Sequence, residues 1–153
     1  MKKLAEFNFK VLHNIVPNGI KISKWDKTIS SLCDYCKMPE NTEHMLYKCS
    51  RIKCLWSKIS RVLGINVSWK TLVCGFIKRE LTEKLKFYNL VLTLIMYGIF
   101  KQNSRCKFEK QSYANVNVSY EVKLYLAYFK VILEATCYDI YSDKIFNDII
   151  SCI

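Results

Sequence analysis

Three cysteines and a histidine stand in the first third of this chain at spacings that suit one metal ion. They are Cys33, Cys36, His44 and Cys49, and three thiolates with one imidazole complete the tetrahedral coordination of Zn²⁺. The Cys33–Cys36 spacing predicts a tight turn that directs both sulfur atoms to one point. A short helix with a loosened last turn would bring His44 and Cys49, five positions apart, to the same ion. The alternative is a chance grouping, since the chain has eight cysteines.

The composition favours one mainly helical domain. The chain has 153 residues, of which 51% are hydrophobic, enough to bury a core without metal. Only four glycines and two prolines are present, which is low for a loop-rich β protein. We therefore predict a mainly α fold, in which a small zinc-knuckle-like loop with a Cys-Cys-His-Cys ligand set is embedded in a helical domain. Residues 1–64 would form the zinc-binding helical module and residues 65–153 a helical extension.

The positive charge is concentrated in the part of the chain that holds the metal ligands. The formal net charge is +11. Residues 1–110 carry 21 lysines and arginines against 8 acidic residues, whereas residues 111–153 carry 3 against 5. Such a balance suits a polyanionic partner such as RNA or DNA. A basic protein that is merely soluble is the alternative.

The cysteines outside the predicted site favour a reducing compartment. Eight cysteines could indicate a secreted disulfide scaffold, but no signal-peptide pattern follows Met1. We expect reduced and mostly buried thiols, and a location in the cytosol or nucleus. The remaining cysteines, which follow no repeating spacing, are Cys54, Cys74, Cys106, Cys137 and Cys152.

Apolar residues at helical spacing predict three helices in the first half of the chain. The first covers residues 3–16. A second, shorter helix over residues 20–27 would be anchored by Trp25. The third follows the last cysteine of the site, with Ser50 as its N-cap and Gly64 as its C-cap.

The second half of the chain predicts a buried central helix followed by a loop and two further helices. Residues 85–100 are nearly all apolar, but their uncharged run is too short to span a bilayer, so we predict a core helix and no membrane partner. The polar residues 101–117 are expected to form a mobile loop or hinge. Ser119 would cap a helix that runs to about Tyr141. Residues 145–150 would form a final short helix. The residues expected to share one face of the Ser119 helix are Leu124, Tyr128, Val131, Ile132, Ala135 and Tyr138.

Cations on and before the helix that leaves the site are the candidates for nucleic-acid binding. They have no acidic partner within the helix, and the opposite face is apolar, with Trp56 as an anchor. The alternative is a solvated polar face that binds nothing. These cations are Lys48, Arg51, Lys53, Lys58 and Arg61. Aromatic residues that could stack on bases are Trp25, Tyr35, Tyr47 and Trp69.

Several stretches together resemble a known family. They run from Glu6 to Pro17 (EFNFKVLHNIVP), through Lys24-Trp25 and Leu32-Cys33-Asp34-Tyr35-Cys36, to Thr42-Glu43-His44-Met45-Leu46, Cys49 and Leu55-Trp56. This pattern is similar to the zinc-binding domain that follows the polymerase in the reverse transcriptases of non-LTR, LINE-type retrotransposons. The likeness covers residues 4–63, and residues 64–153 match only in general character.

The resemblance implies a nucleic-acid-associated module whose metal ligands are Cys33, Cys36, His44 and Cys49. In the family, this region is thought to help engage template RNA or target DNA, and the parent reverse transcriptase would be a partner. We expect no enzyme activity from this chain alone, because it has no Asp-Asp pair and no Tyr-x-Asp-Asp motif to hold two catalytic metal ions.

The chain is expected to be a fragment or truncated copy that begins at an internal methionine. Two other interpretations stay open beside the nucleic-acid module. The first alternative is a protein-interaction module, in which zinc only fixes the packing of helices on the parent polymerase. The second is a decayed reading frame without function.

Overall fold

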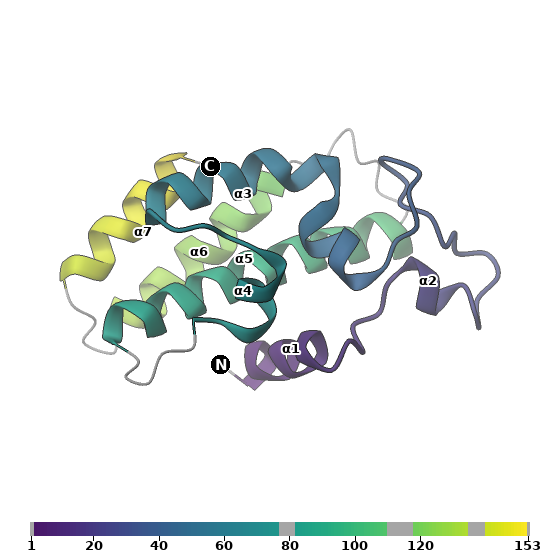
Figure 1. Ribbon diagram of the computed structural model, residues 1–153, viewed down its shortest axis with the longest axis horizontal. Helices are drawn as coiled ribbons and strands as arrows, with labels where there is room; N and C mark the ends of the chain where they lie inside the picture. The colour runs from purple at the N-terminus through teal and green to yellow at the C-terminus, as the bar shows by residue number, and fades with distance from the viewer. Residues whose placement is uncertain (1, 77–81, 110–117, 135–139, 153) are drawn as a thin grey trace.

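The computed structural model describes residues 2–76, 82–109, 118–134 and 140–152 (Figure 1). These residues are mostly helical, and their only β-type pairing is an isolated bridge between Leu32 and Pro39, which confirms the predicted fold class. The helices are α1 (Lys2–Leu12), α2 (Gly19–Ile22), the π-helix η1 (His44–Lys48), α3 (Ser50–Leu63), α4 (Trp69–Cys74), α5 (Glu83–Phe108), α6 (Val118–Glu134) and α7 (Ile140–Cys152).

Helix α5 is the centre of the fold, as the apolar run over residues 85–100 predicts. It has 26 residues and packs against α1, α4, η1 and α6. Val91, Ile95 and Ile99 are completely buried. Among the described helices, none is both long enough and apolar enough to cross a lipid bilayer.

Helix α3 also follows its predicted pattern, with one difference at its start. Its apolar stripe is buried against η1 and α7, and Gly64 ends the helix with φ at 62°, a left-handed conformation that glycine adopts without strain. The predicted N-cap is wrong: Cys49 occupies that position, and Ser50 is already inside the helix. Because Cys49 is also a candidate ligand, α3 begins directly at the metal site.

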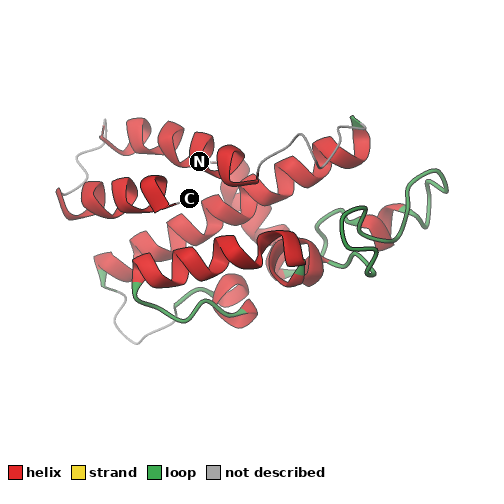
Figure 2. Ribbon diagram, turned by 90° about the horizontal axis from the view of Figure 1, so that it is seen from above, coloured by secondary structure: helices red, strands yellow, loops and turns green. Residues whose placement is uncertain are grey.

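The predicted helices before the metal site are shorter in the structure. Helix α1 ends at Leu12 instead of residue 16, because Asn14 takes a left-handed φ of 51° and the Ile15 N–H donates to the Lys10 carbonyl at 2.8 Å. Helix α2 has four residues. Trp25 lies beyond its end with 75% of its surface exposed, so it is not a buried anchor of the helix. Its indole N–H does donate to the Lys21 carbonyl of α2. Much of the chain between α2 and η1 is loop, which gathers at one end of the molecule (Figure 2).

The predicted loop over residues 101–117 is wrong for its first half. Helix α5 continues to Phe108, and residues 110–117 lie outside the described residues. The polar residues at the end of α5 remain helical because they pack against the loops around the metal site, where Asn103 and Lys107 are buried. This contact is available only in the folded chain.

The face of α6 that carries Leu124 and Tyr128 is turned to solvent where the structure describes it. Leu124 is 47% exposed and Tyr128 64% exposed, while Val122 and Leu126 are fully buried. The register is set by α5: at Gly98 the two helices approach so closely that an added Cβ atom would lie 3.2 Å from Val122 Cγ2. Residues 135–139 lie outside the described part, and α7 contains the predicted final helix over 145–150.

The cysteines outside the site are less buried than predicted. Cys106 is buried, but Cys54 and Cys74 are exposed and Cys152 is half-buried, while Cys137 is among the residues not described. Each described cysteine is free of disulfide bonds.

The division of the chain at residue 64 stays a prediction. The structure adds that a single apolar cluster contains side chains from both sides of this point. The Phe7 ring of α1, for example, lies 5.3 Å from the rings of Tyr97 and Phe100 on α5, measured between ring centres.

Candidate metal centre

A short turn presents the first two candidate ligands. We call residues 32–39 the knuckle turn, because the Leu32–Pro39 bridge closes it. Inside the turn, the Cys33 N–H donates to the Met38 carbonyl, and the Lys37 N–H donates to the Cys33 carbonyl, both at 2.8 Å. Lys37 adopts a left-handed φ of 60°. These bonds fold the backbone back on itself and bring the Cys33 and Cys36 sulfur atoms to the same side.

A π-helical turn presents the other two ligands, as the five-residue spacing predicts. In an α-helix, residues five apart point about 140° away from each other. In η1, the Cys49 N–H instead donates to the His44 carbonyl at 2.9 Å, which is the i to i+5 bond of a π-helix. At the start of η1, the Asn41 side chain accepts the His44 N–H at 2.7 Å. The wider turn lets both side chains reach one point.

The four ligand atoms lie close enough together to hold one metal ion. All are within 4.8 Å of one another. The Cys33 and Cys49 sulfur atoms are 3.8 Å apart, those of Cys36 and Cys49 4.0 Å, and Cys36 Sγ lies 3.2 Å from His44 Nε2. A tetrahedral Zn²⁺ with bonds of about 2.3 Å to sulfur would place two thiolates about 3.8 Å apart. The cluster is therefore compatible with zinc.

The crowding of the thiols strongly perturbs their ionisation. The hydrogen bond from the Cys49 thiol lowers the pKa of Cys33 to about 3. The same bond, followed by burial, raises the pKa of Cys49 far above its ordinary value. Two sulfur atoms this close cannot both carry a negative charge without a cation between them. A divalent ion would supply that charge and release the remaining protons.

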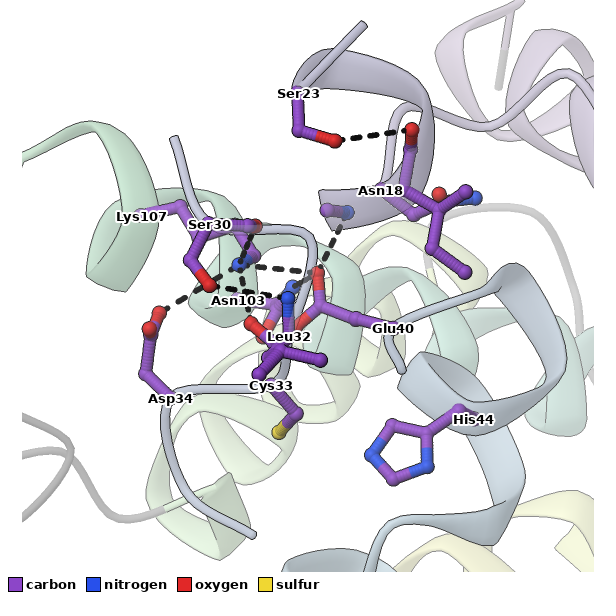
Figure 3. Close-up of polar contacts among 12 residues, drawn as sticks. Asn18, Ser23, Ser30, Leu32, Cys33, Asp34, Glu40, His44, Asn103 and Lys107 are labelled. Carbon is purple, nitrogen blue, oxygen red and sulfur yellow. Dashed lines mark hydrogen bonds and ion pairs between the residues drawn. The ribbon is translucent and has the colours of Figure 1, made fainter. Parts of the chain in front are cut away.

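A buried lysine from α5 holds the knuckle turn against the helical body (Figure 3). The Lys107 ammonium lies 3.4 Å from the Ser30 carbonyl, 3.3 Å from the Leu32 carbonyl, 3.5 Å from Asp34 Oδ2 and 3.4 Å from Glu40 Oε1. The Lys107 residue is only 8% exposed. These oxygens lie on either side of Cys33, so one cation fixes the backbone that carries this ligand.

Glu40 is the buried partner of this lysine. It is completely buried, and its Oε1 accepts the Gly19 N–H at 2.9 Å and the Asn103 side-chain amide at 3.3 Å. Burial raises the pKa of Glu40, and the nearby Lys107 offsets part of this effect. The carboxylate thus connects α2, the end of the knuckle turn and α5.

Further polar contacts position the helix that carries His44. The Asn18 side chain donates to Thr42 Oγ1 at 3.0 Å, and this hydroxyl donates to the Asn14 side chain at 2.8 Å. On the other side, Trp56 Nε1 of α3 donates to the Leu46 carbonyl at 2.9 Å. Trp56 is 4% exposed, which confirms its predicted role as an anchor.

Sequence reasoning missed both Lys107 and Glu40. The signal available was spacing: Asn103, Cys106 and Lys107 continue the three- and four-residue rhythm of the buried positions in α5. A lysine in such a series normally marks the end of the buried face, since lysine is rarely buried without partners. The partners come from residues 30–40, and only the fold brings them close.

The structure separates the five candidate nucleic-acid-binding cations into two groups. Lys53 and Arg61 are exposed on α3, and Lys58 is half-buried there. Lys48 forms an ion pair with Glu43 at 3.0 Å. Arg51 is half-buried. Burial raises the pKa of the Cys106 thiol, and the nearby positive charge of Arg51 offsets part of this rise. Lys53, Lys58 and Arg61 are therefore the cations best placed to meet a ligand.

The four candidate stacking aromatics also differ in accessibility. Trp25 is 75% exposed and Tyr35 52% exposed. Tyr47 is half-buried, and its hydroxyl donates to the Val67 carbonyl at 3.1 Å. Trp69 is half-buried and lines an open groove between α1, the residues just before η1, and α4. Only Trp25 and Tyr35 present most of a ring to solvent.

We expect Lys107→Met to destabilise the fold by about 3–5 kcal/mol, because the Glu40 carboxylate would stay buried without its cation. Adding Glu40→Gln should restore much of this stability, since glutamine still accepts the Gly19 N–H and carries no charge. Urea unfolding at fixed zinc concentration measures both effects. Lys101→Met, on the same helix, is the control. A cost for Lys107→Met no larger than that of the control would contradict the role of the pair.

The stability difference between Glu40→Gln and the wild type should depend on pH. Because burial raises the pKa of Glu40, its contribution to stability is complete below about pH 4.3 and is lost as the pH rises through the higher folded pKa. Glutamine does not titrate, so the variant should gain stability relative to the wild type as the pH rises above about 4.3. Urea unfolding at several pH values measures this, with Glu83→Gln as an exposed control. A difference that stays constant or falls would count against it.

Comparison with known proteins assigns no family to this chain. It matches no protein-family model, no curated protein and no solved structure. The metal centre must therefore be interpreted from its own donor atoms and surroundings.

Proposed function

We propose that this chain is a zinc-binding, nucleic-acid-binding and non-catalytic module of a non-LTR retrotransposon reverse transcriptase. The observation that carries the proposal is the convergence of four metal ligands at the start of a helix with a cationic outer face. The retrotransposon assignment draws on the resemblance of residues 4–63. RNA or DNA is the proposed ligand, and the parent reverse transcriptase the proposed protein partner.

A structural role for the metal follows from the number of its ligands. Catalytic zinc sites usually keep one position for water or substrate, whereas structural sites are closed by four protein ligands. Here four side chains converge, and Cys33 and Cys49 are almost completely buried. A zinc ion at this point would join the knuckle turn to the start of α3. It would hold the chain in shape and leave no position for a reacting molecule.

The polar face of α3 supplies the proposed phosphate contacts. Lys53, Lys58 and Arg61 fall within about 140° of the helix circumference, and Lys53 and Arg61 are about 12 Å apart along the axis. No ion pair within the described residues ties any of the three to a carboxylate. Because Cys49 directly precedes α3, the metal would determine where this face points.

A second candidate function is a protein-interaction module, and the surface of α6 favours it. Tyr120, Leu124 and Tyr128 are 59%, 47% and 64% exposed and are spaced four residues apart. Residues at this spacing lie on one side of a helix, so they form an apolar stripe. Aromatic residues are enriched in protein interfaces. This stripe would suit contact with the parent polymerase.

Purified protein should contain one Zn²⁺ per chain, because three thiolates and one imidazole form a closed tetrahedral site. Cys36→Ser and His44→Ala should each lower the bound zinc, whereas Cys54→Ser, which changes an exposed cysteine outside the cluster, should keep it. Metal analysis of protein purified without chelators measures the content. Absence of zinc from the wild type, or equal loss from the Cys54 control, would refute the assignment.

Replacing Lys53, Lys58 and Arg61 together with glutamine should weaken binding to RNA and DNA about equally across sequences. For every phosphate that the variant no longer neutralises, the slope of log affinity against log salt should fall by roughly 0.7–0.9. Arg51 is left unchanged because it contacts Cys106. The control replaces Lys2, Lys3 and Lys70, which are also exposed, with glutamine. It lowers the net charge by the same amount as the test variant. Equal affinity and salt slope for the two triple variants would favour the interaction module.

A further inference from the structure

The outer surface of the knuckle turn carries apolar side chains that the core does not use. Because the Cys33 and Cys36 sulfur atoms point to the metal cluster, the residues around them face outward. Leu32 is 40% exposed, Tyr35 52% and Met38 58%. Large apolar side chains grouped at the surface, unlike scattered ones, indicate a binding site. Tyr35, between the two cysteines, is held on either side by a candidate metal ligand.

Positive charges outnumber negative ones in and just before the turn, where three exposed lysines stand against Asp26 and Asp34. Lys37, which comes between Tyr35 and Met38 in the sequence of the turn, is exposed. Lys24 and Lys27 are exposed in the loop before the turn. The ion pairs of the described residues include none of these three lysines. The acidic residue of the turn itself, Asp34, faces the Lys107 ammonium. An apolar surface in such a setting suits a ligand that combines flat apolar faces with negative charge.

We infer that the knuckle turn binds unpaired bases of a single-stranded nucleic acid, with the Tyr35 ring as the stacking surface. Unpaired bases offer free faces to an aromatic ring, whereas bases in a duplex are already stacked on one another. Leu32 and Met38 would contact the edges of the same bases, and Lys37 the adjoining phosphate. This inference rests on the proposed nucleic-acid function and adds to it a preference for single strands.

The loop before the turn offers a second aromatic surface for the same strand. Trp25 is exposed and lies in the segment between α2 and η1. The loops of this segment gather at one end of the molecule (Figure 2). Proteins that bind single strands without sequence preference combine several such rings with a basic surface. The turn is also ordered before binding, because Lys107 and the metal ligands fix its backbone. A preordered loop loses less conformational entropy when it binds.

The test compares zinc-loaded wild type and variants by fluorescence anisotropy. The probes are labelled oligouridylate and oligothymidylate of about 12 nucleotides, within the size range of such sites, and a duplex of equal length. Tyr35→Ala should weaken single-strand binding roughly 5- to 150-fold, which corresponds to the removal of one stacked base, and should leave the salt slope unchanged. Tyr35→Phe should bind like the wild type. Phe9→Ala, which removes a similarly exposed ring on α1, should also bind like the wild type.

Zinc content is measured for each variant, and Tyr35→Leu is included because it keeps apolar bulk in the turn while removing the ring. Weakened binding by zinc-loaded Tyr35→Leu supports stacking. Wild-type affinity in both zinc-loaded Tyr35→Leu and Tyr35→Ala overturns the inference and leaves the proposed nucleic-acid function standing. Equal weakening on single strands and duplex also overturns it. A wild type that binds none of the probes at low salt removes both the inference and the proposed function.

Discussion

The geometry of the metal centre depends on one buried cation, the Lys107 ammonium. The segment from residue 23 to residue 43 is mostly loop and contributes little to the apolar cluster, so its own side chains cannot hold it on the helical body. The Lys107 ammonium replaces that missing contact with two backbone carbonyls and the carboxylates of Asp34 and Glu40. A lysine buried this deeply requires such partners, because an uncompensated charge in the interior is very costly.

The metal ligands and α3 form one mechanical unit. Cys49 ends the π-helical turn and occupies the N-cap position of α3, and Trp56 of α3 donates back to the Leu46 carbonyl of that turn. The direction of α3 therefore depends on the same turn that brings His44 and Cys49 together. A metal ion bound there would stabilise both at once, and the cations on the outer face of α3 would keep a fixed position relative to the knuckle turn.

Three surfaces of the molecule differ in chemistry and would recognise different things. The outer face of α3 is cationic and suits phosphates, whose contacts depend strongly on salt. The knuckle turn is apolar with lysines around it and suits bases, whose stacking depends much less on salt. The stripe on α6 combines two tyrosines and a leucine and suits a protein surface. Under the proposed function, the first two surfaces would bind RNA or DNA and the third the parent polymerase.

The sequence by itself determined the ligand set, the helix after it and the core of α5. Cys33 and Cys36 lie in one turn, and the spacing of His44 and Cys49 requires a π-type turn, so neighbouring residues decide both. Gly64 likewise ends α3 by its own conformational freedom. What only the tertiary structure decided is burial: that Lys107 lies inside, that Trp25 lies outside, and that α6 turns Leu124 and Tyr128 to solvent. Turns and caps are settled by atoms within a few residues, whereas burial depends on which distant surface, such as Gly98 for α6 or the Ser30–Glu40 loop for Lys107, comes to lie against a side chain.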